Sequence, residues 1–175
     1  MNKKDGLQVK GRYRALNLYR DLKPNEIENA RRYLNGEKQL GSLLPIVREY
    51  EATNLCPASG RGVFAHLLAG DTTYTGAVNY GAFGSGSTAF NATSTQLNTE
   101  VYRKLCSGSA FDGTSTYIDW YIASGDVANQ TFTEFMAVID GTASANTGQA
   151  ISLLLTGGWV KSGAMFVSLS MAING

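Results

Sequence analysis

Charged and chemically reactive side chains are scarce in this chain. Asp, Glu, Lys and Arg make up 17% of its residues, whereas a typical share is about 25%. Two cysteines, Cys56 and Cys106, are too few for the disulfide scaffold of a small secreted domain. His66 is the only histidine, which excludes a zinc site built from several histidines. The formal net charge of +1 indicates no general attraction to nucleic acid or to acidic membranes.

Long apolar runs are missing as well. No stretch approaches the roughly 20 apolar residues that span a membrane. Residues 1–14 are polar and basic, unlike the apolar centre of a signal peptide. We therefore expect a protein that is made in the cytoplasm, has no membrane or nucleic-acid partner and needs no cofactor.

The charges that are present are unevenly distributed. Residues 1–56 hold 11 Lys/Arg and 7 Asp/Glu, a balance of +4, and residues 57–175 hold 4 and 7, a balance of −3. The simpler interpretation is a solvated basic arm beside a neutral domain. In the alternative, the arm of one copy lies on its neighbour. We accordingly divide the chain into an N-terminal arm for attachment and oligomerisation, residues 1–45, and a domain of residues 46–175.

Four local patterns stand out in the first 71 residues. The imperfect alternation in residues 7–20 predicts a strand or extended arm broken by Gly11. Pro24 and a capping Asn25 predict a helix of about three turns that ends at Gly36. Residues 46–55 alternate as a strand does, and residues 58–71 have the spacing of a short helix.

From residue 78 onward, short apolar runs alternate with turn clusters. The runs are VNYGAF, EVYRKL, TYIDWYIAS, TFTEFMAVI, AISLLLT and AMFVSLSMAI. Within 116–123, Ile118 and Trp120 share one face, and Tyr117 and Asp119 the other. We predict a mainly β chain, an antiparallel β-sandwich (jelly-roll-like) of roughly seven or eight strands. It has one short internal helix and an N-terminal extended and helical arm.

A catalytic set cannot be assembled from these residues. A thiol of Cys56 or Cys106 paired with His66 is conceivable, but its surroundings lack positive charge. GAFGSGST at 81–88 lacks the lysine of a phosphate-binding loop. The acids Asp112, Asp119, Asp126, Glu134 and Asp140 are scattered, and those in Asp-Gly pairs are typical of turns. We therefore expect a protein that is not an enzyme.

An ordered series of segments carries a likeness to known proteins. The segments are NLCPASGRGVFAHLLAGD at 54–71, VNYGA at 78–82, GSGSTAF at 84–90, LNTEVYRK at 97–104 and FTEF at 132–135. Together they resemble a family of tailed-phage virion proteins that are described as tail fibre, appendage or structural proteins. Met136 stands where that family commonly has Gly. The resemblance implies a β-rich virion module without catalysis.

That resemblance sets the functional expectation. It implies a structural subunit of the tail, neck or fibre apparatus, located in the virion and made in the cytoplasm of the host bacterium. Its partners would be other virion proteins of the tail, the portal or neck, or the capsid. We expect a homo-oligomer, either a trimer or a hexamer. The alternative is a receptor-binding module that recognises host-surface glycan.

Two groups of residues are candidates for a role. Glu100 and Arg103 lie three positions apart, and we predict a structural ion pair, Glu100–Arg103 or Glu134–Arg103. Trp120, Tyr121 and Trp159 are predicted interface aromatics, and in the alternative function they would stack on sugar rings.

Overall fold

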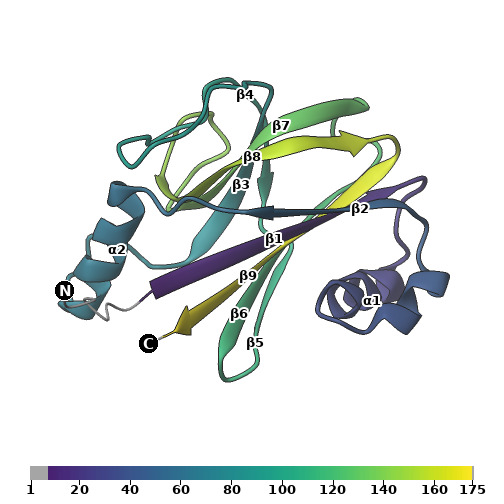
Figure 1. Cartoon of the computed structure of the whole chain (residues 1–175), viewed down its shortest axis with the longest axis horizontal. Coiled ribbons are helices and arrows are strands. Elements are labelled where there is room, and N and C mark those ends of the chain that lie inside the picture. The colour runs from purple at the N-terminus through teal and green to yellow at the C-terminus, as the bar shows by residue number, and fades with distance from the viewer. Residues whose placement is uncertain (1–7, 175) are drawn as a thin grey trace, which may run out of the picture.

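The chain folds into two antiparallel β-sheets that pack face to face (Figure 1). A computed structural model describes residues 8–174. Sheet A contains, in order, β2 (Ile46–Thr53), β1 (Gln8–Leu18), β9 (Ala164–Asn174), β6 (Ser115–Ile122) and β5 (Gly108–Phe111). Sheet B contains β4 (Glu100–Leu105), β3 (Val78–Gly84), β7 (Gln130–Ile139) and β8 (Gln149–Lys161). The prediction of a mainly β chain with antiparallel sheets is confirmed.

Most strands lie where the apolar runs predicted them, and two differences come from the turn clusters. β5 lies inside a cluster that we interpreted as a turn, so the described residues form nine strands. β8 continues to Lys161, through two glycines that we also assigned to a turn. Gly157 and Gly158 both have positive φ, at 70° and 99°. The strand pairing with β7 is irregular there, as in a β-bulge.

The expected N-terminal arm is not a separate unit. β1 lies between β2 and β9 and pairs with both, and its Tyr13 and Ala15 are fully buried between the sheets. Gly11 does not break the strand, and its N–H donates to Asn54 Oδ1 at 3.2 Å. The boundary at residue 45 is therefore wrong, because residues 8–18 are an inner strand of the sandwich. Residues 1–7 of the expected arm lie outside the described residues.

Helix α1 (Pro24–Leu34) was predicted from the sequence and covers the outer face of sheet A. Its Ala30 and Leu34 pack against Leu16 and Phe166. The N-cap is Lys23 rather than Asn25. A 3₁₀ helix, η1 (Lys38–Leu43), follows where we expected a loop.

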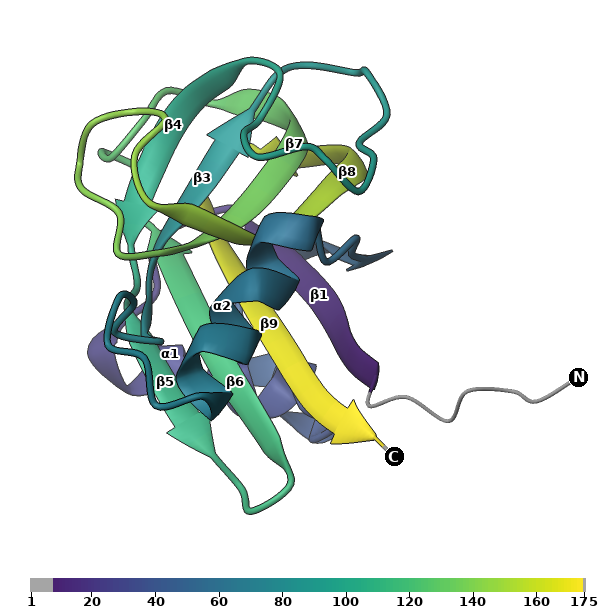
Figure 2. The same cartoon turned by 90° about the vertical axis from the view of Figure 1, so that its left-hand side faces the viewer.

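The predicted internal helix is α2 (Ala58–Leu68), which lies at the opposite side of the molecule from α1 in Figure 1 and in front of it in Figure 2. α2 packs on β8, and the contact depends on Gly60. A Cβ atom at this position would lie 2.9 Å from Ile151 Cα. A side chain at residue 60 would therefore push the helix away from the sheet.

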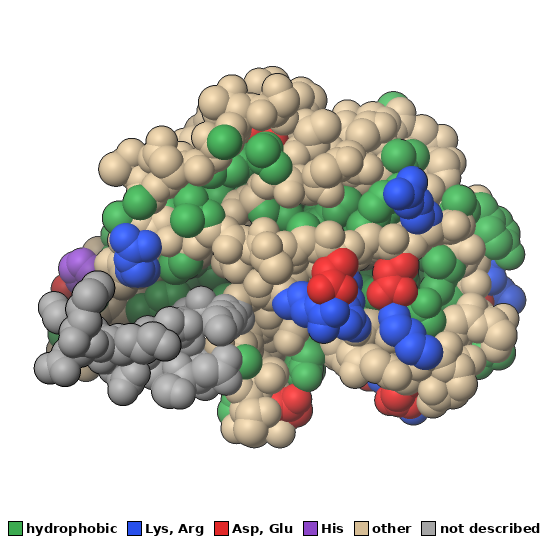
Figure 3. Space-filling model, in the orientation of Figure 1, with side chains coloured by type: hydrophobic (Ala, Val, Ile, Leu, Met, Phe, Trp, Pro, Cys, Tyr) green, Lys and Arg blue, Asp and Glu red, His purple; other side chains and the backbone are tan. Residues whose placement is uncertain are grey.

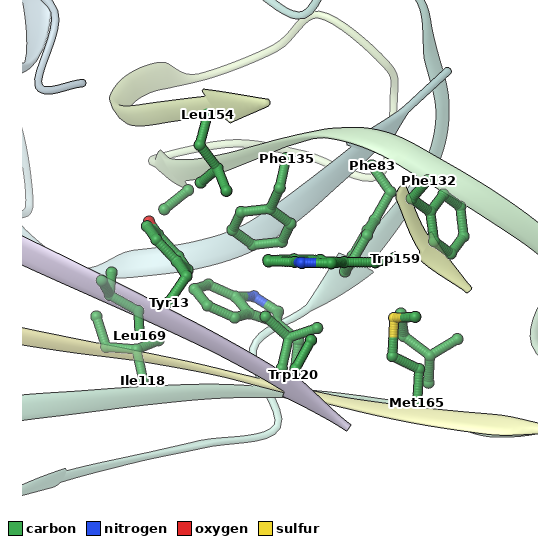
Figure 4. Packing of buried hydrophobic residues seen from close by; sticks show 14 of the residues in the cluster. Tyr13, Phe83, Ile118, Trp120, Phe132, Phe135, Leu154, Trp159, Met165 and Leu169 are labelled. Atoms are coloured by element: carbon green, nitrogen blue, oxygen red, sulfur yellow. The ribbon is translucent and has the colours of Figure 1, made fainter. Parts of the chain in front are cut away.

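The space between the sheets is filled by aromatic rings (Figure 4). Phe135 lies at their centre, with its ring centroid 4.8 Å from that of Phe83, 5.1 Å from Trp120 and 5.7 Å from Trp159. Rings of this size dominate the burial energy of a core. The predicted inward face of β6 is confirmed, because Ile118 and Trp120 both belong to this cluster.

The segments that cross from one sheet to the other are hydrogen-bonded to strands of sheet B. After β2 the chain crosses to sheet B, where Leu55 and Leu153 exchange backbone hydrogen bonds of 2.9 and 3.0 Å. After β4 it crosses back, and Cys106 N–H donates to Asn79 O at 2.8 Å. These crossings cover parts of the strand edges that would otherwise invite non-specific pairing.

Candidate functional site

Two long loops leave opposite ends of sheet B and meet over its outer face. Residues 85–99 connect β3 to β4, and residues 140–148 connect β7 to β8. Both lie at the top of the molecule in Figure 1. Gln96 Nε2 donates to Asn146 O at 3.4 Å and links one loop to the other. We call residues 85–99 and 140–148 the loop platform.

Glu100 and Arg103, both on β4, form a buried ion pair beneath this platform. The Arg103 guanidinium donates through Nε to Glu100 Oε1 at 2.7 Å and through Nη2 to Glu100 Oε2 at 2.8 Å. Both side chains are 3% exposed. The pair is therefore not a solvated surface contact, and losing one partner would leave the other charge buried.

The same ion pair fixes the loop between β7 and β8. Arg103 Nη1 donates to Thr147 O at 2.8 Å and to Thr142 O at 3.3 Å. On the other side, Asn146 N–H donates to Glu100 Oε2 at 3.2 Å. Every nitrogen of the guanidinium therefore donates a hydrogen bond, and the buried side chain holds the loop in place.

Glu134 lies on β7 and does not pair with Arg103, so the second of the two predicted pairings is absent. The Glu134 side chain is fully buried, and no basic side chain among residues 8–174 pairs with it. Its carboxylate instead accepts backbone N–H groups from Gly86 at 3.2 Å, Asn98 at 3.2 Å and Thr99 at 3.1 Å. The Asn98 side-chain amide donates a fourth hydrogen bond. Glu134 therefore draws both ends of the 85–99 loop onto the sheet.

The contact between this loop and Glu134 requires glycine. A Cβ atom at Gly86 would lie 2.6 Å from Glu134 Oε1, and one at Gly84 would lie 2.5 Å from Oε2. Farther along, Leu97 packs onto the outer face of sheet B with Ala82, Met136, Val138, Ala150 and Leu153. The platform is therefore held by polar contacts at its ends and apolar contacts below.

The side chains on the outer surface of the platform are small, and nearly all of them are uncharged. The exposed residues of the platform include Thr142, Ala143, Ser144 and Ala145. A cleft of about 300 Å³ runs between β4 and this loop. Val101, Tyr102 and both alanines line it, together with the buried Glu100–Arg103 ion pair. In Figure 3 charged atoms gather mainly in the lower half of the view, and the loops at the top carry few. Such a surface lets another protein approach closely.

The predicted interface aromatics lie elsewhere. Trp120 and Trp159 are fully buried in the core, so neither is available to a partner or a sugar ring. Tyr121 is half-buried, and its hydroxyl accepts Leu22 N–H at 2.8 Å and donates to Asp21 Oδ1 at 3.0 Å. The expectation is therefore corrected for Trp120 and Trp159, because strand alternation does not distinguish a core face from an interface face. For Tyr121 it stays a prediction.

His66 and the two cysteines are not brought together as a reactive group. His66 Nδ1 lies 2.6 Å from Asp71 Oδ2 at the end of α2. Cys56 and Cys106 are free thiols, and burial raises the pKa of each. A raised pKa disfavours the thiolate that a nucleophile needs.

Of the scattered acids, Asp112 and Asp126 hold turns. Asp112 accepts Thr114 N–H at 2.9 Å and Ser115 N–H at 2.7 Å, and these bonds lower its pKa to about 2. In residues 8–174, no group of three or more His, Cys, Asp or Glu could hold a metal ion. Within the same residues, no helix has the length and apolar character to cross a membrane.

Two buried charged groups were not predicted from the sequence. Asp119 is fully buried below α1, where it accepts hydrogen bonds from Arg31 and from Ser168 Oγ, the latter at 2.6 Å. Burial raises the pKa of this carboxyl. Lys161 is also fully buried and donates to Val127 O at 2.9 Å. A polar residue on a strand gave the only signal for Asp119, since the sequence did not show that helix α1 would pack over this strand.

Comparisons with known proteins add no further constraint. No family model, no curated protein and no solved structure matches this chain.

Proposed function

We propose that this chain is a non-catalytic structural subunit of a tailed-phage particle. It belongs to the tail, neck or fibre apparatus and assembles by oligomerisation and by docking to other virion proteins. The observation that carries the proposal is the burial of Glu100, Arg103 and Glu134 under the loop platform. Residues of the segments that resemble virion proteins thus build a surface rather than a reactive centre.

The way in which copies would meet differs from our first expectation. Trp120 and Trp159 are inside the core, and β1 is an inner strand. Exchange of that strand between copies would take sheet A apart. The nearly uncharged platform and its cleft therefore become the proposed contact surface. The two antiparallel sheets do not by themselves define a jelly-roll. The jelly-roll-like connectivity therefore remains part of the proposal.

Native mass spectrometry of the purified chain tests this proposal. We expect a homo-oligomer, a trimer or a hexamer. Ala145→Arg places a charge in the platform cleft and should give a folded monomer, because Ala145 is exposed. Ala69→Arg is the matched control at the end of α2, also an exposed position, and should remain oligomeric. A wild-type monomer that binds no other virion protein would contradict the proposal.

A further inference from the structure

A polar cavity of about 140 Å³ lies on the outer face of sheet A, beside the C-terminal end of α1. Strand pairing sets its floor and walls. Arg12 on β1 is opposite Ser170 on β9, which is opposite Tyr117 on β6, and Arg14 is opposite Ser168. Leu34 and Asn35 at the end of α1 line another side of the cavity. Its position is therefore fixed by the central strands and not by a loop.

Arg14 has hydrogen-bonding capacity to spare at this cavity. Its Nη1 donates to Leu34 O at the end of α1. Its Nε is buried without a hydrogen-bond partner, and Glu51 Oε2 is 3.8 Å away, beyond hydrogen-bond distance. Buried donors in folded proteins nearly always have a partner, such as another group, an ordered water or an ion. An unsatisfied guanidinium nitrogen therefore indicates that something else occupies this place.

The neighbouring carboxylates are already engaged. Glu51 receives two hydrogen bonds of 2.6 Å from Arg12. Asp119 is held by Arg31 and by Ser168. The lining itself contains two guanidinium groups and no carboxylate. The group that would complete it is an acceptor with negative charge.

We propose that this cavity binds a small oxyanion. A guanidinium matches the paired oxygens of a carboxylate or phosphate group, and such charge-assisted hydrogen bonds are strong. At about 30 Å³ per liquid water, the cavity of about 140 Å³ has room for about five waters, which suits a single phosphate or carboxylate group. The oxyanion comes either from a free ion or from a group on a neighbouring copy of the chain. This site goes beyond the proposed virion role and does not depend on it.

Isothermal titration calorimetry with inorganic phosphate, at an ionic strength held constant with chloride, tests the site. Wild type should bind phosphate saturably. Arg14→Gln should weaken binding about tenfold or more, as expected for one lost charge-assisted bond. Ser170→Leu should weaken it similarly by filling the cavity while keeping both arginines. Arg48→Gln is the matched control, because Arg48 lies over the Tyr50 ring on β2 and outside the cavity.

Melting curves would show that each variant is folded. The proposal is overturned if phosphate gives no heat beyond that of chloride, or if folded Arg14→Gln and Ser170→Leu both bind like wild type. Sedimentation with and without phosphate separates the two sources. Dissociation of an oligomer by phosphate identifies a carboxylate from a neighbouring copy, because the two compete. Binding without any change in mass identifies a free oxyanion.

Discussion

Replacing Glu134 by Gln should loosen the loop platform while leaving the sandwich folded. The substitution keeps the size of the side chain but converts one acceptor oxygen into an NH₂ donor. In the wild type, each carboxylate oxygen accepts two hydrogen bonds. Oε2 accepts the backbone N–H groups of Gly86 and Thr99, and Oε1 accepts the backbone and side-chain N–H groups of Asn98. In either orientation of the Gln amide, two buried donors lose their acceptor and face another donor.

The size of this effect follows from the cost of unsatisfied buried groups. Each such group costs about 1–3 kcal/mol, so two of them should lower the free energy of unfolding by about 2–6 kcal/mol. A domain is typically stable by about 5–15 kcal/mol. Glu134→Gln should therefore remain folded at low temperature in most of this range. The loss should be local, because the acceptor serves only the 85–99 loop.

Chemical denaturation measures the total loss, and hydrogen exchange read by mass spectrometry locates it. Peptides covering residues 85–99 should exchange faster in Glu134→Gln, and peptides of β1 and β9 should not. Glu37→Gln is the control, because Glu37 pairs with Arg32 at an exposed position and should cost less than about 1 kcal/mol. Equal losses in the two variants, with unchanged exchange in 85–99, would refute the reasoning.

Three further predictions concern other parts of the chain. Arg103→Ala should cost about 3–5 kcal/mol, as for a broken buried ion pair, and should speed hydrogen exchange in residues 140–148; a loss under 1 kcal/mol would refute it. Trp159→Ala should lower stability by about 3–5 kcal/mol on denaturation, and a neutral result would contradict its place in the core. Hydrogen bonds from Arg20 and from the Lys23 backbone lower the pKa of Glu26 to about 2. The stabilisation by this carboxylate should be fully present above pH 4.5, the ordinary pKa of a Glu side chain. It should be lost as the pH falls toward 2. Melting temperatures of wild type and Glu26→Gln should therefore converge in acid, and a constant gap would exclude this role.

The strands were predictable because one face of each is buried. Alternation placed Ile118 and Trp120 on the inner face of β6, and the structure does the same. Position within the sheet was not predictable, since the 7–20 pattern is the same for a free arm and for an inner strand. β5 was missed because Gly108–Phe111 is short and has small side chains typical of turns.

The candidate site was predictable only in part. The spacing of Glu100 and Arg103 suggested an ion pair, and the structure places these two side chains together. The sequence could not show that Thr142 and Thr147 would cover the pair, because these loop residues become neighbours only after β7 and β8 pair. For the same reason, the amide groups around Glu134 could not be foreseen. All four donors belong to residues at least 35 positions away.

The central claim is that the chain is a structural part of a phage particle. Quantitative mass spectrometry of purified particles, from a phage that encodes this chain, tests it most directly. Our account predicts that the chain is present in the particle in several copies, in fixed proportion to the other virion proteins. Its presence in infected cells together with its absence from purified particles would contradict the account.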